Sequence, residues 1–122
     1  MAENMNEKKY RWYKIADTES ELIFPPNNLL QIEVAGKKIC VARGKKLYAC
    51  TAKCPHAGGI IADGFINDAD IVTCPFHRYK FSLQNGRNIS GEGYYLKTFP
   101  VQTTEDGVFI GIEETGLLSW LK

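Results

Sequence analysis

The chain has 122 residues, with 15 Lys and Arg against 14 Asp and Glu, and a formal net charge of +1. This length is typical of one domain, and a domain of this size buries enough surface to fold without disulfides. The near-zero charge gives no electrostatic basis for binding nucleic acid or an anionic membrane. No apolar run approaches the roughly 20 residues of a membrane span, and the charged start MAENMNEKKYRWYK lacks the apolar centre of a signal peptide. We therefore expect a cytoplasmic protein.

Strand patterns recur along the chain, whereas helical periodicity is scarce. The segment DTESEL (17–22) is predicted to form one helical turn. Leu30, Ile32 and Val34 then alternate with polar residues, which indicates a half-buried strand. A turn at residues 35–37 leads into the next strand.

The next two strands, KKICVAR and KLYACTA, are predicted to form a hairpin around Gly44-Lys45. In the register set by that turn, Cys40 lies opposite Ala49, and Cys50 falls on the other face of the hairpin. We therefore expect no disulfide between the two cysteines and predict that both are small buried side chains. A turn longer or shorter by one residue would reverse this geometry.

The later strands are short and closely spaced. Residues 71–74 are predicted to form one strand, KFSLQ follows, and YYLKTFPVQT and GVFIGIE are predicted to be joined by a turn at 105–107. About eight strands in all indicate an all-β fold, a small antiparallel β-sandwich or barrel. Residues 52–80, rich in Gly, Cys, His and Pro, are predicted to be an insert carried by this sandwich, within one domain that spans residues 1–122.

Both histidines of the chain lie in this insert, each close to a cysteine. The pattern is Cys54-x-His56, then 17 residues, then Cys74-x-x-His77. Two thiolates and two imidazoles supply four ligands, enough for a metal centre. A structural zinc site usually groups its cysteines together and its histidines together, whereas each pair here is mixed. The order suits a centre in which one iron takes both cysteines and the other takes both histidines, with zinc as the alternative.

The motifs CPHAG and CPFH, with their separation, resemble those of the Rieske [2Fe–2S] proteins. The resemblance covers nearly the whole chain, from a W-x-x-I first strand through a hairpin and two cluster loops to a final V-x-x-x-x-x-G-V hairpin. It implies the Rieske fold, in which a two-loop cluster-binding subdomain is inserted into an antiparallel β-sandwich. It also implies one [2Fe–2S] cluster per chain, whose iron ligands are Cys54, His56, Cys74 and His77.

The residues around the expected cluster indicate a low reduction potential. Gly58 and Gly59 are expected either to let backbone N–H groups approach the bridging sulfides or to be ordinary turn residues, and both interpretations predict the same loops. High-potential members of the family carry a disulfide whose cysteines would fall at Gly59 and Phe76, and hydroxyl groups at the positions of Tyr79 and Phe81. The disulfide cannot form here, and Phe81 has no hydroxyl. With fewer hydrogen bonds to sulfur, the resemblance implies a potential near the low end of the family range, about −150 mV.

Two stretches depart from the family pattern. Arg78 follows the second histidine, where the family usually has Gly, and Ser-Gly-Glu-Gly at 90–93 replaces a third loop that usually bears proline. The charged side chains near these positions either border a docking face or form an ordinary solvated surface; they are Arg78, Lys80, Arg87 and Glu92.

The sequence contains the parts of an electron carrier and lacks those of an enzyme. No histidine is left over for the mononuclear iron of an oxygenase, and no Rossmann fingerprint is present. The chain resembles the ferredoxin components of aromatic-ring oxygenase systems. That resemblance implies a flavin-dependent reductase and an oxygenase or other redox acceptor as partners, docked transiently at a tip formed by His56 and His77. The alternatives are the small subunit of an assimilatory nitrite reductase and a structural zinc module.

Overall fold

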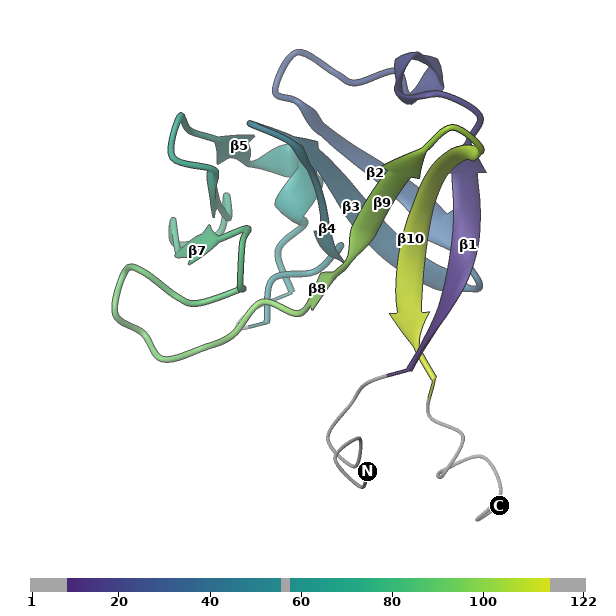
Figure 1. Cartoon of the computed structure of the whole chain (residues 1–122). Helices are drawn as coiled ribbons and strands as arrows, with labels where there is room; N and C mark the ends of the chain where they lie inside the picture. The colour runs from purple at the N-terminus through teal and green to yellow at the C-terminus, as the bar shows by residue number, and fades with distance from the viewer. Residues whose placement is uncertain (1–8, 56–57, 115–122) are drawn as a thin grey trace.

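The computed structural model describes residues 9–55 and 58–114, which form three antiparallel sheets (Figure 1). The first sheet has the order β1-β10-β9 and consists of β1 (Tyr10–Ala16), β10 (Gly107–Glu113) and β9 (Val101–Thr104). The second has the order β2-β3-β4-β8 and consists of β2 (Leu29–Val34), β3 (Lys37–Arg43), β4 (Leu47–Thr51) and β8 (Thr98–Phe99). The third consists of β5 (Phe65–Ile66), β6 (Ile71–Thr73) and β7 (Lys80–Ser82). Two 3₁₀ helices, η2 (Glu19–Glu21) and η3 (Ile61–Asp63), complete the described elements.

The predicted all-β antiparallel class is therefore confirmed. Among the described residues, no helix has the length and apolar character needed to cross a membrane.

The second sheet lies between the other two, and its strands β3 and β4 are buried on both faces along most of their length. Side chains alternate across a strand, so neighbouring residues of β3 enter different cores. Ile39 and Val41 pack in one core with residues of β10, such as Ile110. Cys40 and Ala42 pack in the other core, with residues of the third sheet. The near-continuous apolar runs of β3 and β4 reflect this double burial. The third sheet lies apart from β1 and β10 in Figure 1.

The predicted register of the β3–β4 hairpin is wrong. The connection contains three residues, 44–46, because Arg43 pairs with Leu47. This extra residue places Cys40 opposite Cys50, and both side chains enter the same core. Their predicted burial is confirmed, and both are free thiols. A hydrogen bond with Cys40, followed by burial, raises the pKa of the Cys50 thiol well above its ordinary value.

The stretch YYLKTFPVQT, predicted as one strand, contains two strands that belong to different sheets. β8 pairs with β4 in the second sheet, and β9 pairs with β10 in the first. Pro100 lies between them and has no N–H to donate to a ladder, so the strand cannot continue through it. Its carbonyl accepts a hydrogen bond from the Gly111 N–H at 3.0 Å.

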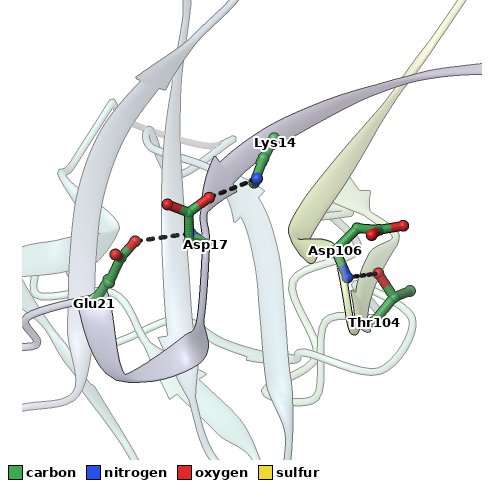
Figure 2. A network of polar contacts seen from close by, with 5 residues as sticks. All are labelled: Lys14, Asp17, Glu21, Thr104 and Asp106. Carbon is green, nitrogen blue, oxygen red and sulfur yellow. Dashed lines mark hydrogen bonds and ion pairs between the residues drawn. The ribbon is translucent and has the colours of Figure 1, made fainter.

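Polar contacts lie at the end of β1 and in the β9–β10 turn (Figure 2). The predicted helical turn is η2, where the Glu21 carboxylate accepts a hydrogen bond from the Asp17 N–H at 2.7 Å. Lys14 Nζ lies 2.5 Å from Asp17 Oδ1. In the β9–β10 turn, the Asp106 N–H donates to Thr104 Oγ1 at 3.1 Å. These contacts lie on the surface and shape β1 and the β9–β10 hairpin only.

A buried carboxylate connects the third sheet to the second. Asp70, just before β6, is only 2% exposed. The Tyr48 hydroxyl donates to Asp70 Oδ2 at 2.5 Å, and the Lys45 N–H donates to Asp70 Oδ1 at 3.1 Å. At Gly44, a Cβ would lie 2.3 Å from the same Oδ1 atom, so only glycine permits this approach. The carboxylate therefore fixes the start of β6 against the β3–β4 hairpin.

A second side chain, from the segment before β2, forms hydrogen bonds with the backbone of residues 62–64. Asn27 Nδ2 donates to the carbonyl oxygens of Ala62 and Gly64, at 2.8 and 2.9 Å. Gly64 in turn lies so close to β6 that a Cβ would be 1.9 Å from the Thr73 carbonyl oxygen. The two contacts tie both ends of the β5–β6 region to the sandwich.

We predict that Tyr48→Phe lowers the free energy of unfolding by about 1–3 kcal/mol, because it removes a hydrogen bond to a buried carboxylate. Burial, followed by the bond to Asp70, raises the pKa of Tyr48 above its ordinary value. As the pH rises past about 10, the unfolded chain therefore loses this proton before the folded chain does. The advantage of the wild type over the variant should be constant below about pH 9 and shrink above about pH 10.

Urea unfolding at neutral pH and at about pH 10.5 measures both effects. Tyr13→Phe is the matched control, because the Tyr13 hydroxyl makes no hydrogen bond within the described part of the chain. Equal stability of wild type and Tyr48→Phe at neutral pH would show that this contact does not hold the sheets together.

Candidate metal centre

Two loops of the same construction carry the predicted cysteines. The first begins with Cys54, three residues after the end of β4 at Thr51, and the second begins with Cys74, directly after β6. Each has proline as its second residue. Each is closed by the cysteine N–H, which donates to a carbonyl five residues later: Cys54 to Gly59 at 2.7 Å and Cys74 to Tyr79 at 2.8 Å. The backbone thus positions both thiols without using the sulfur atoms.

The two thiols are buried neighbours in one core. Cys54 is 3% exposed and Cys74 is fully buried, and both pack with Ile61 and Phe81. Burial raises the pKa of the Cys74 thiol to about 11; the Phe76 N–H opposes this rise, and Cys54 adds to it. A thiol with this pKa is neutral at pH 7, so a metal ion must displace its proton on binding.

The backbone also provides a donor directed at sulfur. The Phe76 N–H donates to Cys74 Sγ at 3.4 Å. N–H groups directed at sulfur stabilise negative charge on a thiolate, as they do around iron–sulfur clusters. This contact is therefore the kind expected at a thiolate metal ligand.

Glycine allows the two loops to approach each other. At Gly59 a Cβ would lie 2.9 Å from Cys74 Sγ and 2.9 Å from the Cβ of Phe76. Gly59 and Phe76, the positions at which the disulfide of high-potential proteins would fall, are therefore neighbours. Gly58 has φ +75°, which glycine adopts without strain. A larger residue at position 59 would push the first loop away from the sulfur of Cys74.

His77 lies at the exposed end of the second loop. Both His77 and Arg78 have positive φ, 61° and 59°. The family's usual glycine at position 78 fits this left-handed backbone, and Arg78 adopts it despite the steric cost to a residue with a Cβ. His56 lies outside the described residues. Within the described part of the chain, no three Cys, His, Asp or Glu side chains are grouped to hold an ion, so the set of four ligands stays a prediction.

A row of aromatic rings runs from the second loop to the segment after β7. Ring centroids are 5.4 Å apart for Phe76 and His77, 6.2 Å for His77 and Tyr79, and 5.8 Å for Tyr79 and Tyr94. Burial, then the Glu92 carboxylate and Tyr94, raises the pKa of Tyr79. The segment after β7 therefore takes the place of the usual third loop beside the site.

Asn88 holds this third loop in shape, and the sequence interpretation missed its role. Asn88 Oδ1 accepts the Gly93 N–H at 2.9 Å, while its Nδ2 donates to the Lys80 carbonyl at 3.1 Å and to Glu92 Oε1 at 2.9 Å. Its only sequence signal was an Asn-Ile-Ser sequon, which gives no information about this role. Tyr94, Asp70 and Asn27 were missed as well, because their partners are distant in sequence.

The described residues fit a metal group bound through thiolates. Two neighbouring buried thiols, an N–H directed at sulfur and a glycine at the point of closest approach are what such a group requires.

Comparison with known proteins identifies the family. Residues 11–100 match the model of the Rieske [2Fe–2S] domain. The chain is 28% identical over 113 residues to cholesterol 7-desaturase nvd of Bombyx mori. That match covers 86% of this chain and 24% of that protein. It is 26% identical over 91 residues to the 3-phenylpropionate/cinnamic acid dioxygenase ferredoxin subunit of Shigella flexneri. That match covers 74% of this chain and 86% of that protein.

The fold is also found among solved structures. The ferredoxin of carbazole 1,9a-dioxygenase from Nocardioides aromaticivorans superposes with a TM-score of 0.69 at 19% identity, covering 81% of this chain and 95% of that one. The chain spans at most 24% of the first four curated relatives, which are three cholesterol 7-desaturases and a nitrite reductase [NAD(P)H]. The match over residues 11–100 shows that the chain belongs to the Rieske [2Fe–2S] domain family.

Proposed function

We propose that this protein is a one-electron carrier with one Rieske [2Fe–2S] cluster per chain, held by Cys54, His56, Cys74 and His77. The observation that carries the proposal is the pair of Cys-Pro loops, whose buried thiols are neighbours while His77 lies at an exposed end. A bound cluster of this type stores one electron, at a potential raised by its two histidine ligands.

The surrounding residues divide the site into a dry side and an open side. On the dry side, Cys54 and Cys74 pack with Ile61 and Phe81, which keeps water from the sulfur atoms. On the open side, His77 is exposed, and Phe76 beside it is 52% exposed. Electrons therefore enter and leave at the histidine end, where a partner approaches closely without unfolding any part of the chain.

The contacts around Cys74 support a potential near the low end of the family range, about −150 mV. Among the described residues, the Phe76 N–H is the one hydrogen bond to the Cys74 sulfur from outside the thiol pair. Phe81 is fully buried and has no hydroxyl, and no disulfide can link positions 59 and 76. The missing hydroxyl donor leaves the charge added on reduction less stabilised.

We propose a flavin-dependent reductase as the electron donor and an oxygenase or similar redox protein as the acceptor, each docked transiently at the His56 and His77 end. The similarity to the ferredoxin subunit of the 3-phenylpropionate/cinnamic acid dioxygenase of Shigella flexneri favours an oxygenase as the acceptor. The small subunit of a nitrite reductase is the second candidate, favoured by a 40% identical segment of 70 residues in the nitrite reductase of Emericella nidulans. Affinity capture from native cells distinguishes the two by the enzyme recovered.

We predict that the purified protein is red-brown with about two irons and two sulfides per chain, and that Cys74→Ala loses both. Cys50→Ala is the matched control, because Cys50 is also fully buried but has no predicted role as a ligand. It should keep about two irons per chain. Stoichiometric zinc in the wild type, or iron retained by Cys74→Ala, would refute the proposed ligand set.

We also predict that the cluster-free Cys74→Ala chain keeps its first sheet. The core beneath β1 and β10 contains Val108 and Ile110 but neither loop cysteine, so loss of the cluster leaves its packing intact. Hydrogen exchange should show protected amides in β1 and β10 and faster exchange in residues 70–83. Faster exchange in β1 and β10 as well as in residues 70–83 would show that the core beneath β1 and β10 is not independent of the core around the cysteine loops.

A further inference from the structure

Most of the large exposed apolar side chains of the described residues lie in the second cysteine loop and in the segment after β7. Of the seven large exposed hydrophobic residues in the described part of the chain, four lie between positions 76 and 95: Phe76, Ile89, Tyr94 and Tyr95. Their exposed fractions run from 42% to 65%. Exposed aromatic groups that gather in one place are typical of protein interaction surfaces.

Ring contacts join four side chains into one surface, which we call the aromatic face: Phe76, His77, Tyr79 and Tyr94. The Ile89 N–H donates to the Lys80 carbonyl at 2.8 Å, and Arg87 forms a bridge with Tyr95. The segment after β7 lies on the side of the molecule away from β1 and β10, where the sandwich leaves it accessible (Figure 1).

The charges around the aromatic face are mostly positive. Arg78, Lys80 and Arg87 are exposed, and none of them forms an ion pair within the described residues. The acidic residue of this segment, Glu92, directs Oε1 at Asn88 and Ser90 of its own loop. Three cations against one anion give this region a larger positive charge than the formal +1 of the whole chain.

We propose that the aromatic face, bordered by Arg78, Lys80 and Arg87, docks a redox protein whose own docking face is acidic. This inference rests on the proposed electron-carrier function and adds the chemistry of the partner. Opposite charges raise the rate of encounter, and aromatic and Arg side chains then supply the contact. Because His77 belongs to the face, docking there brings the partner next to the predicted iron ligand.

Two inorganic oxidants test the sign of the local charge without an identified partner. The reduced cluster-loaded protein is mixed with hexacyanoferrate(III), an anion, or with tris(phenanthroline)cobalt(III), a cation, at rising salt concentration. The rate with the anion should fall about three- to tenfold between low and physiological salt, and the rate with the cation should rise.

Comparison of Arg78→Glu with Lys46→Glu shows whether the salt dependence of the rates comes from charges beside the aromatic face or from the net charge of the chain. Each replaces one cation by one anion, so both lower the formal chain charge from +1 to −1. Lys46 lies at the β3–β4 turn, at the end of β4 opposite Cys54. Arg78→Glu should reduce or reverse the salt dependence of both rates, whereas Lys46→Glu should leave most of it in place. Lys80→Glu provides a second test outside the cysteine loop and should act as Arg78→Glu does.

Equal salt dependence in Arg78→Glu and Lys46→Glu, or rates in the wild type that do not respond to salt, would overturn the docking face while leaving the electron carrier intact. Absence of any electron exchange with either oxidant would refute the proposed function and this inference together. The iron content of each variant, measured beforehand, shows that a changed rate does not come from a lost cluster.

Discussion

The pairing of β3 with β4 is the constraint on which the rest of the structure depends. Both strands are buried on both faces, so the register decides which side chains enter which core. With Cys40 opposite Cys50, Tyr48 lies in the core shared with the third sheet, where its hydroxyl reaches Asp70. A slip of one residue would turn Tyr48 to the other face and leave Asp70 buried without that donor.

This hairpin also positions both cysteine loops, by two different routes. β4 ends at Thr51, and the loop of Cys54 begins three residues later. The loop of Cys74 follows β6, and Asp70 fixes the start of β6 against Tyr48 and the Lys45 N–H. The thiols therefore meet because one loop continues the hairpin while the other is hydrogen-bonded to it. Gly59 then lets the two loops come within contact distance.

Local patterns were enough to predict most of the strands, the antiparallel class and the two Cys-Pro loops, because alternation and turn residues are properties of adjacent positions. The two-residue strand β5 was not predicted, and β8 and β9 were predicted as one strand. The three-residue β3–β4 turn was not predicted, since Gly-Lys is compatible with more than one loop length. Asp70 reads as an ordinary turn residue, and its burial depends on Tyr48, which is 22 positions earlier. The aromatic row likewise depends on the third loop, which Asn88 shapes through contacts with no sequence signature.

The scaffold holds buried sulfur on one side and exposes an imidazole and aromatic rings on the other, which is the division of roles that an electron carrier needs. The central claim is that one iron site binds two histidines, and pulsed EPR of the reduced protein labelled with ¹⁵N-histidine tests it most directly. The account predicts couplings to two histidine nitrogens, with one remaining in His77→Cys. A reduced cluster without histidine coupling, or a protein that contains zinc and gives no signal, would contradict it.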